Sequence, residues 1–145
     1  MRRFPAVIVV LAVIAALQTA RFGAVRFFKM AADGEMSWAF ALPAGIGDLL
    51  IAATAPWVVF VLLKNRTPTT RRWVIIWNIA GIADLLLAVT LGFLTNFPLQ
   101  ARLESVLADD LTMGFIPMVA VPACVLLHMV GIVILSRART AQLFS

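Results

Sequence analysis

Four apolar stretches, joined by short polar segments, are the feature that most restricts the fold of this chain. They cover approximately residues 4–20, 42–63, 73–95 and 112–135. Hydrophobic residues make up 63% of the sequence, charged residues make up 13%, and the mean hydropathy is +1.01. A soluble domain of 145 residues cannot bury this much apolar surface. The sequence therefore predicts an all-α integral membrane protein, a four-transmembrane-helix bundle that forms a single membrane domain over 1–145.

The first stretch is shorter than the ~20 residues that a helix needs to cross a bilayer. It extends from 4–20 to 4–28 if the charged end of Arg21 snorkels to the membrane interface. A secretory signal peptide is the alternative, because two arginines precede the apolar run. The tripeptide at 18–20, Gln-Thr-Ala, lacks the small-x-small pattern of a cleavage site. We therefore expect this segment to be a retained membrane anchor.

The positive charges predict the orientation of the chain. With four spans, the two termini and the loop between the second and third spans share one side of the membrane. That side carries eight of the 12 basic residues. They are Arg2, Arg3, Lys64, Arg66, Arg71, Arg72, Arg137 and Arg139. The positive-inside rule then predicts a multi-pass protein of the cell inner (plasma) membrane with cytoplasmic N- and C-termini. We expect its formal charge of +5 to contact anionic lipid rather than nucleic acid.

The loop between the third and fourth spans has an amphipathic pattern. Leu99, Leu103, Val106 and Leu107 recur at helical spacing, and charged residues fill the intervening positions. This pattern predicts a short amphipathic interfacial helix in the outer loop at 99–111. An ordinary connector that packs on the bundle is the alternative.

Two of the spans contain nearly the same eleven residues. The segment 44–54 is repeated at 80–90, and eight of the eleven positions are identical. Each copy puts one aspartate, Asp48 or Asp84, inside an apolar run. Ionisable side chains are expensive in hydrocarbon, so an acid at membrane depth is a functional-site hypothesis by default. Because the two spans run in opposite directions, the copies form a local inverted repeat, a pattern that marks substrate sites in many transporters.

Small residues share a helical face with each aspartate. They are Gly45 and Ala52 in the second span, and Gly81, Ala88 and Gly92 in the third. Small residues allow the backbones of membrane helices to approach closely. We therefore expect these five positions to pack against neighbouring helices, and both aspartates to point at those helices rather than at lipid.

Further polar groups lie at comparable depths in the other spans. At ~1.5 Å per residue, Asp84 falls near the midplane, Asp48 lies about 7 Å towards the outer side, and His128 lies about 6 Å towards the inner side. The candidate proton- or ion-handling residues are Asp48, Asp84, His128, Asn78, Gln18 and Arg21. A ladder of Asp and His side chains across a bilayer suits a proton relay or a cation pathway, because each group can gain and lose charge.

A structural role is the alternative for these residues. The aspartates would then be protonated and hydrogen-bonded between helices, or paired with Arg21.

The sequence contains no catalytic triad, zinc signature, phosphate-binding loop or dinucleotide fingerprint, which favours a role other than catalysis. We expect no cofactor and no metal; haem or copper at His128 is a less favoured alternative. The sequence favours a small membrane protein that handles protons or small cations as an oligomer, since four short helices enclose little space. The competing hypothesis is an accessory or structural subunit of a larger membrane complex, one that binds haem, quinone or pigment.

Overall fold

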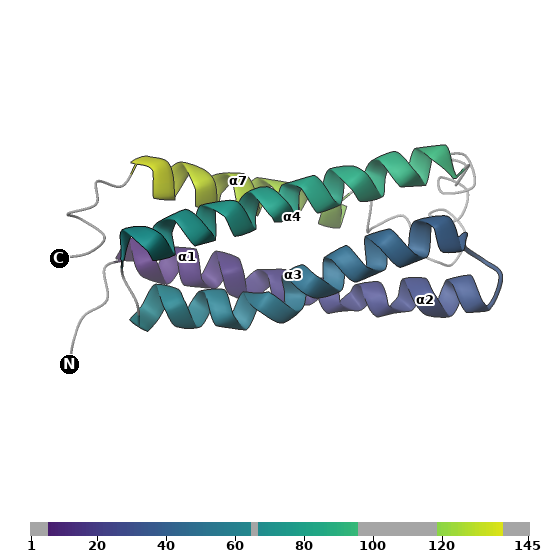
Figure 1. Cartoon of the computed structure of the whole chain (residues 1–145), viewed down its shortest axis with the longest axis horizontal. Helices are drawn as coiled ribbons and strands as arrows, with labels where there is room; N and C mark the ends of the chain where they lie inside the picture. The colour runs from purple at the N-terminus through teal and green to yellow at the C-terminus, as the bar shows by residue number, and fades with distance from the viewer. Residues whose placement is uncertain (1–5, 65–66, 96–118, 138–145) are drawn as a thin grey trace.

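The computed structural model describes residues 6–64, 67–95 and 119–137, and these ranges are helical except for short turns (Figure 1). They contain no strand, which confirms the all-helical prediction for this part of the chain. In chain order the elements are α1 (Ala6–Leu17), the 3₁₀ helix η1 (Gln18–Ala24), α2 (Val25–Ala32), α3 (Trp38–Lys64), α4 (Pro68–Leu94) and α7 (Val121–Arg137).

Three helical segments of 27 residues are long and apolar enough to cross a membrane. The first combines α1, η1 and α2 over Ala6–Ala32, and the other two are α3 and α4. An α-helix of this length extends about 40 Å, which exceeds the ~30 Å hydrocarbon core of a bilayer. The chain is therefore compatible with a membrane protein. Of the fourth predicted span, the structure describes the part from residue 119 onwards, and the predicted interfacial helix at 99–111 lies outside the described residues.

The helices run up and down the long axis of the molecule (Figure 1). The beginnings of α1 and α4 and the ends of α3 and α7 lie together, and we call this the Arg137 end. At the opposite end the chain turns from α2 into α3 through Gly34, whose φ of 79° favours glycine; we call this the Gly34 end. At the Arg137 end, Thr67 begins α4 by accepting a hydrogen bond from the backbone N–H of Thr70 at 3.1 Å.

The apolar core consists of two clusters. The Arg137-end core contains Ile8, Leu11, Ala15, Val58, Val61, Leu62, Val74 and Leu135. The Gly34-end core contains Ala24, Phe27, Ala31, Met36, Phe40, Ala41 and Ala44. In the second cluster the rings of Phe27 and Phe40 meet edge to face, with their centroids 5.5 Å apart. The buried polar side chains of the described residues, Gln18, Arg21, Asn78 and His128, belong to neither cluster and form part of the candidate site.

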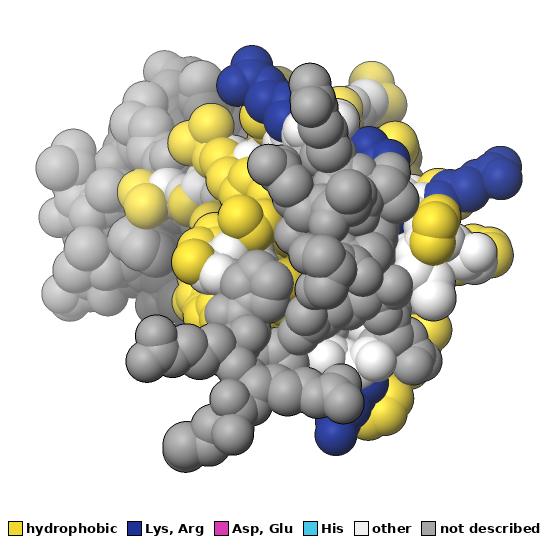
Figure 2. All heavy atoms as spheres, turned by 90° about the vertical axis from the view of Figure 1, so that its left-hand side faces the viewer, with side chains coloured by type: hydrophobic (Ala, Val, Ile, Leu, Met, Phe, Trp, Pro, Cys, Tyr) yellow, Lys and Arg dark blue, Asp and Glu magenta, His cyan; other side chains and the backbone are white. Residues whose placement is uncertain are grey.

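The surface at the Arg137 end is basic and apolar. Figure 2 views the molecule from this end, where Lys and Arg side chains lie among hydrophobic ones and no acidic side chain is in view among the described residues. The described basic residues at this end are Lys64, Arg71, Arg72 and Arg137. Arg71 also joins two helices, because its Nε donates to the backbone carbonyl of Leu135 at 2.7 Å and its Nη2 to that of Ser136 at 3.2 Å.

Candidate functional site

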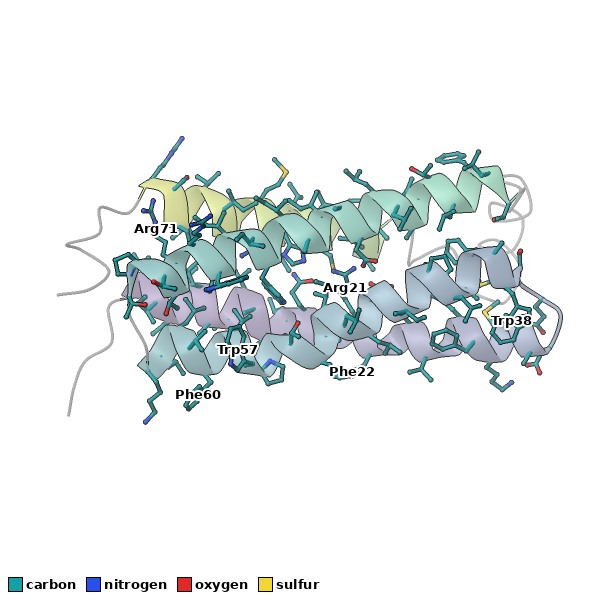
Figure 3. The ribbon with its side chains drawn as sticks, viewed as in Figure 1. Arg21, Phe22, Trp38, Trp57, Phe60 and Arg71 are labelled. Carbon is teal, nitrogen blue, oxygen red and sulfur yellow. The ribbon has the colours of Figure 1, made fainter. Side chains whose placement is uncertain are left out.

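The 3₁₀ helix η1 aims Arg21 into the bundle. A 3₁₀ helix has three residues per turn, so Gln18, Arg21 and Ala24 lie on one face, and all three are buried. The next residue, Phe22, is exposed, and Figure 3 shows Arg21 about midway along the bundle. Arg21 is 6% exposed. The segment is therefore helical beyond Arg21, as in the longer version of the first span, but the side chain of Arg21 lies inside the bundle instead of snorkelling to an interface.

Two carboxylates from different helices explain why Arg21 remains inside. Its Nε donates to Oδ1 of Asp48 in α3 at 2.5 Å, and its Nη2 donates to Oδ2 of Asp84 in α4. The aspartate side chains are 15% and 13% exposed, so both ion pairs are shielded from solvent. The two aspartates of the repeated segment thus share one guanidinium.

His128 of α7 lies beside the remaining guanidinium nitrogen of Arg21, which donates to neither aspartate. Its Nε2 is 3.4 Å from Nη1 of Arg21, and its Nδ1 is 2.9 Å from Oδ1 of Asn78. The amide nitrogen of Asn78 donates to the carbonyl of Val74 at 2.8 Å, which turns the amide oxygen towards the imidazole. An amide oxygen can accept but not donate, so Nδ1 carries the proton and Nε2 presents a lone pair to the guanidinium. Asn78 therefore sets the tautomer of a neutral His128.

The charged groups converge at one point instead of lying at separate depths. The depth estimate spread Asp48, Asp84 and His128 over several turns, but all three lie within reach of the Arg21 guanidinium. Counting residues along straight helices ignores the length of the arginine side chain and its direction from η1. We call Arg21, Asp48, Asp84 and His128 the Arg21 cluster. Gln18 lies one 3₁₀ turn from Arg21 on the same face of η1.

Glycines make room for the cluster. A Cβ atom added at Gly47 would overlap with Oδ1 of Asp84, and one added at Gly81 would overlap with the ring of His128. A Cβ atom at Gly131 would lie 2.9 Å from Oδ1 of Asn78. Gly81 was predicted as a packing position, whereas Gly47 and Gly131 were not. The sequence feature that could have identified Gly47 is a difference between the two copies of the repeat, because Ala83 occupies the equivalent position in the second copy.

The other predicted packing positions also lie at helix contacts. A Cβ atom at Gly45 would lie 2.6 Å from Cζ of Phe28 in α2. Ala52 and Gly92 are buried, and Ala88 packs against the Gly34-end core.

Trp77 is a neighbour of the cluster that the sequence analysis did not select. Its ring meets that of His128 edge to face, with centroids 5.3 Å apart, and its Nε1 donates to Oγ1 of Thr54 at 2.8 Å. Thr54 is the last residue of the first copy of the repeat, in α3, and Trp77 directly precedes Asn78 in α4. This hydrogen bond therefore joins the two helices beside the cluster. The adjacent pair Trp77-Asn78 thus contacts His128 with both side chains.

The Arg21 cluster has an unbalanced charge. One guanidinium faces two carboxylates, which leaves one net negative charge when both acids are ionised and His128 is neutral. A single proton on one of the acids or on the imidazole neutralises the cluster. Both ring nitrogens of His128 lie near polar side chains, Nδ1 at 2.9 Å from Asn78 and Nε2 at 3.4 Å from Arg21. The described residues contain no group of three or more His, Cys, Asp or Glu side chains that could hold a metal ion.

Comparison with known proteins gives one match. Residues 5–136 match the model of a family described as a domain of unknown function, DUF8737. No curated protein and no solved structure matches the chain.

Proposed function

We propose that this chain, which belongs to the DUF8737 family, is a membrane protein that takes up and releases protons at the Arg21 cluster. The observation that carries the proposal is the sharing of one guanidinium by two partly buried carboxylates, Asp48 and Asp84. An unbalanced charge is expensive in a medium of low dielectric constant, so the cluster favours the state that holds one extra proton. A change in local hydration or helix packing that stabilises the ionised state releases this proton.

The geometry favours a proton over a metal cation. Small cations such as Ca²⁺ and Mg²⁺ prefer a shell of six or so oxygen ligands, and Arg21 already occupies one oxygen of each aspartate. Its fixed positive charge also repels a second cation at short range. A proton, by contrast, needs a single lone pair, which either carboxylate or Nε2 of His128 supplies.

The proposal includes an orientation and an assembly. We place the Arg137 end in the cytoplasm, with the protein in the inner (plasma) membrane, because the described part of that end carries basic residues and no acid. We further propose that copies of the chain associate, since a bundle of this size encloses little space for a pathway of its own.

A flux measurement tests the proposal. The purified protein is reconstituted into liposomes that contain a pH-sensitive dye, and a potassium gradient with valinomycin supplies the driving force. We expect proton flux from the wild type, and its loss in Asp48→Asn and Asp84→Asn. The matched control is Asp33→Asn, which removes an exposed aspartate bound to Lys29 on the surface and leaves the flux unchanged. Absence of wild-type flux at every imposed gradient contradicts the proposal, and an equal flux driven by sodium alone reassigns the ion.

A second candidate is an accessory or structural subunit of a membrane complex. The observation that favours it is that Arg21 pairs with acids from two different helices, an arrangement that also suits a static link between helices. Purification in a mild detergent, with mass and absorbance measured together, separates the two candidates. A subunit retains partner chains at a fixed stoichiometry, and a visible absorption band indicates haem or pigment.

A further inference from the structure

The surroundings of the Arg21 cluster differ on its two sides. In the described part of the chain, the buried polar or charged side chains are Gln18, Arg21, Asn78 and His128. The direction of the helices places Gln18 and Asn78 nearer the Arg137 end than Arg21 and Asp84 respectively. Towards the Gly34 end the same face of η1 continues with Ala24, which belongs to the apolar Gly34-end core. The cluster is therefore polar towards the Arg137 end and apolar towards the Gly34 end.

The inverted repeat shows this difference at equivalent positions. Gly45 precedes Asp48 by three residues, as Gly81 precedes Asp84. Each glycine accommodates an aromatic ring from a neighbouring helix, but the ring at Gly45 is Phe28 and the ring at Gly81 is His128. Because α3 and α4 are antiparallel, Phe28 lies towards the Gly34 end and His128 towards the Arg137 end. A ring that can exchange protons faces one end, and a ring that cannot faces the other.

Gln18 provides an independent observation on the polar side. Its side chain is fully buried, yet neither its amide oxygen nor its amide nitrogen has a hydrogen-bond partner among the described residues. A buried amide without partners is costly, and ordered water is the usual partner of such groups. The amide offers both an acceptor and two donors, which matches the donors and lone pairs of water. It lies on the face of η1 that carries Arg21, one turn, or about 6 Å, nearer the Arg137 end.

We propose that Gln18 holds the water through which the Arg21 cluster exchanges its proton, and that this water comes from the Arg137 end alone. In the exchange, a hydronium ion gives its proton to a carboxylate oxygen of Asp48 or Asp84 and leaves as water; release is the reverse step. The route from the Arg137 end passes the packed side chains of the Arg137-end core, so water reaches Gln18 only when this core opens transiently. Phe28 and the Gly34-end core close the opposite route in this conformation. The role of this water in proton exchange rests on the proposed function, but its position at Gln18 does not.

Cysteine labelling tests the position of the water. Gln18 and Ala24 flank Arg21 at equal spacing on one buried face of η1, so they form a matched pair. Gln18→Cys and Ala24→Cys are made separately after replacement of the single native cysteine by Cys124→Ser. A membrane-impermeant methanethiosulfonate is added to right-side-out and inverted membrane vesicles. Asp33→Cys and Arg137→Cys, in the same background, report which end each preparation exposes.

We expect Gln18→Cys to react at least about tenfold faster than Ala24→Cys, because the local opening that exposes residue 18 should require less free energy than the one that exposes residue 24. The reaction should occur in the preparation that labels Arg137→Cys and not in the one that labels Asp33→Cys. Equal rates at the two positions, no reaction at Gln18→Cys, or labelling from the Gly34 end would each overturn the inference. The labelling does not require transport, so a protein without proton flux that still labels at Gln18→Cys refutes the proposed function and leaves the inference standing.

Discussion

The ring of His128 lies so close to the backbone of Gly81 that no side chain fits between them. We expect Gly81→Ala to push the imidazole away from Arg21 and to lower the free energy of unfolding by about 1–3 kcal/mol, the usual cost of overpacking. The control is Gly23→Ala, because a Cβ atom at that position has no neighbour within 4 Å. Thermal unfolding in detergent should give a lower Tm for the first variant than for the second. A Gly81→Ala protein as stable as Gly23→Ala contradicts the close contact.

Arg21 is expected to matter for stability through charge rather than size. Arg21→Met leaves two acids in the bundle without a cation, and loss of one partner of a buried ion pair costs about 3–5 kcal/mol. Adding Asp48→Asn and Asp84→Asn to Arg21→Met should restore much of the lost stability, since the cluster is then neutral. Chemical unfolding of the single and triple variants measures this coupling. If the triple variant is less stable than Arg21→Met, the ion pairs are not the source of the effect.

The tautomer of His128 can be observed directly, because the chain contains one histidine. We expect the nitrogen spectrum of protein labelled with ¹⁵N-histidine to show a neutral ring that is protonated at Nδ1. Asn78→Leu removes the acceptor for this proton, so the spectrum should shift towards the Nε2-protonated form. Gln18→Leu is the control, since the amide of Gln18 makes no hydrogen bond to the ring. A ring protonated at Nε2 in the wild type would refute the role of Asn78.

Arg71 should hold the end of α7 against α4. Its two hydrogen bonds satisfy carbonyl groups in the last turn of α7, where no further backbone N–H of the helix is available. Hydrogen bonds to charged groups contribute about 1.5–3 kcal/mol, so Arg71→Ala should destabilise α7 by a comparable amount. Hydrogen exchange should become faster in α7 and change little in α1. The neighbouring Arg72 is exposed, and Arg72→Ala should leave the exchange unaltered.

The apolar pattern was sufficient to predict the helices but not their ends. The predicted spans 42–63 and 73–95 correspond to α3 and α4. Both helices begin earlier than the predicted apolar runs: α3 begins with the apolar residues 38–41, and α4 begins with a polar first turn that hydropathy does not mark as helix. The start of α4 illustrates this, since Thr67 and Pro68 form a favourable helix beginning that hydropathy does not detect.

The members of the cluster were visible in the sequence, but their arrangement was not. Asp48 and Asp84 were selected because they interrupt apolar runs, and the inverted repeat placed them on antiparallel helices. Arg21 lies near the end of its apolar stretch, where a long cationic side chain ordinarily turns to the interface. Its inward direction depends on acids far away in the chain, which no local pattern reveals. Pairing of the aspartates with Arg21 was one alternative from the sequence, but the sharing of one guanidinium by both acids required the structure.

The 3₁₀ helix η1 changes the register of the first long apolar segment, Ala6–Ala32. Each of its seven residues turns the chain by about 120° and advances it by about 2.0 Å, against 100° and 1.5 Å in an α-helix. Over η1 these differences accumulate to a rotation of about 140° and a gain of about 3.5 Å. A single helical wheel drawn through α1 and α2 therefore assigns the wrong face to every residue of α2. The residues of η1 that direct Arg21 into the bundle therefore also rotate α2 relative to α1. As a result, one continuous helical segment presents different faces to α3 before and after η1.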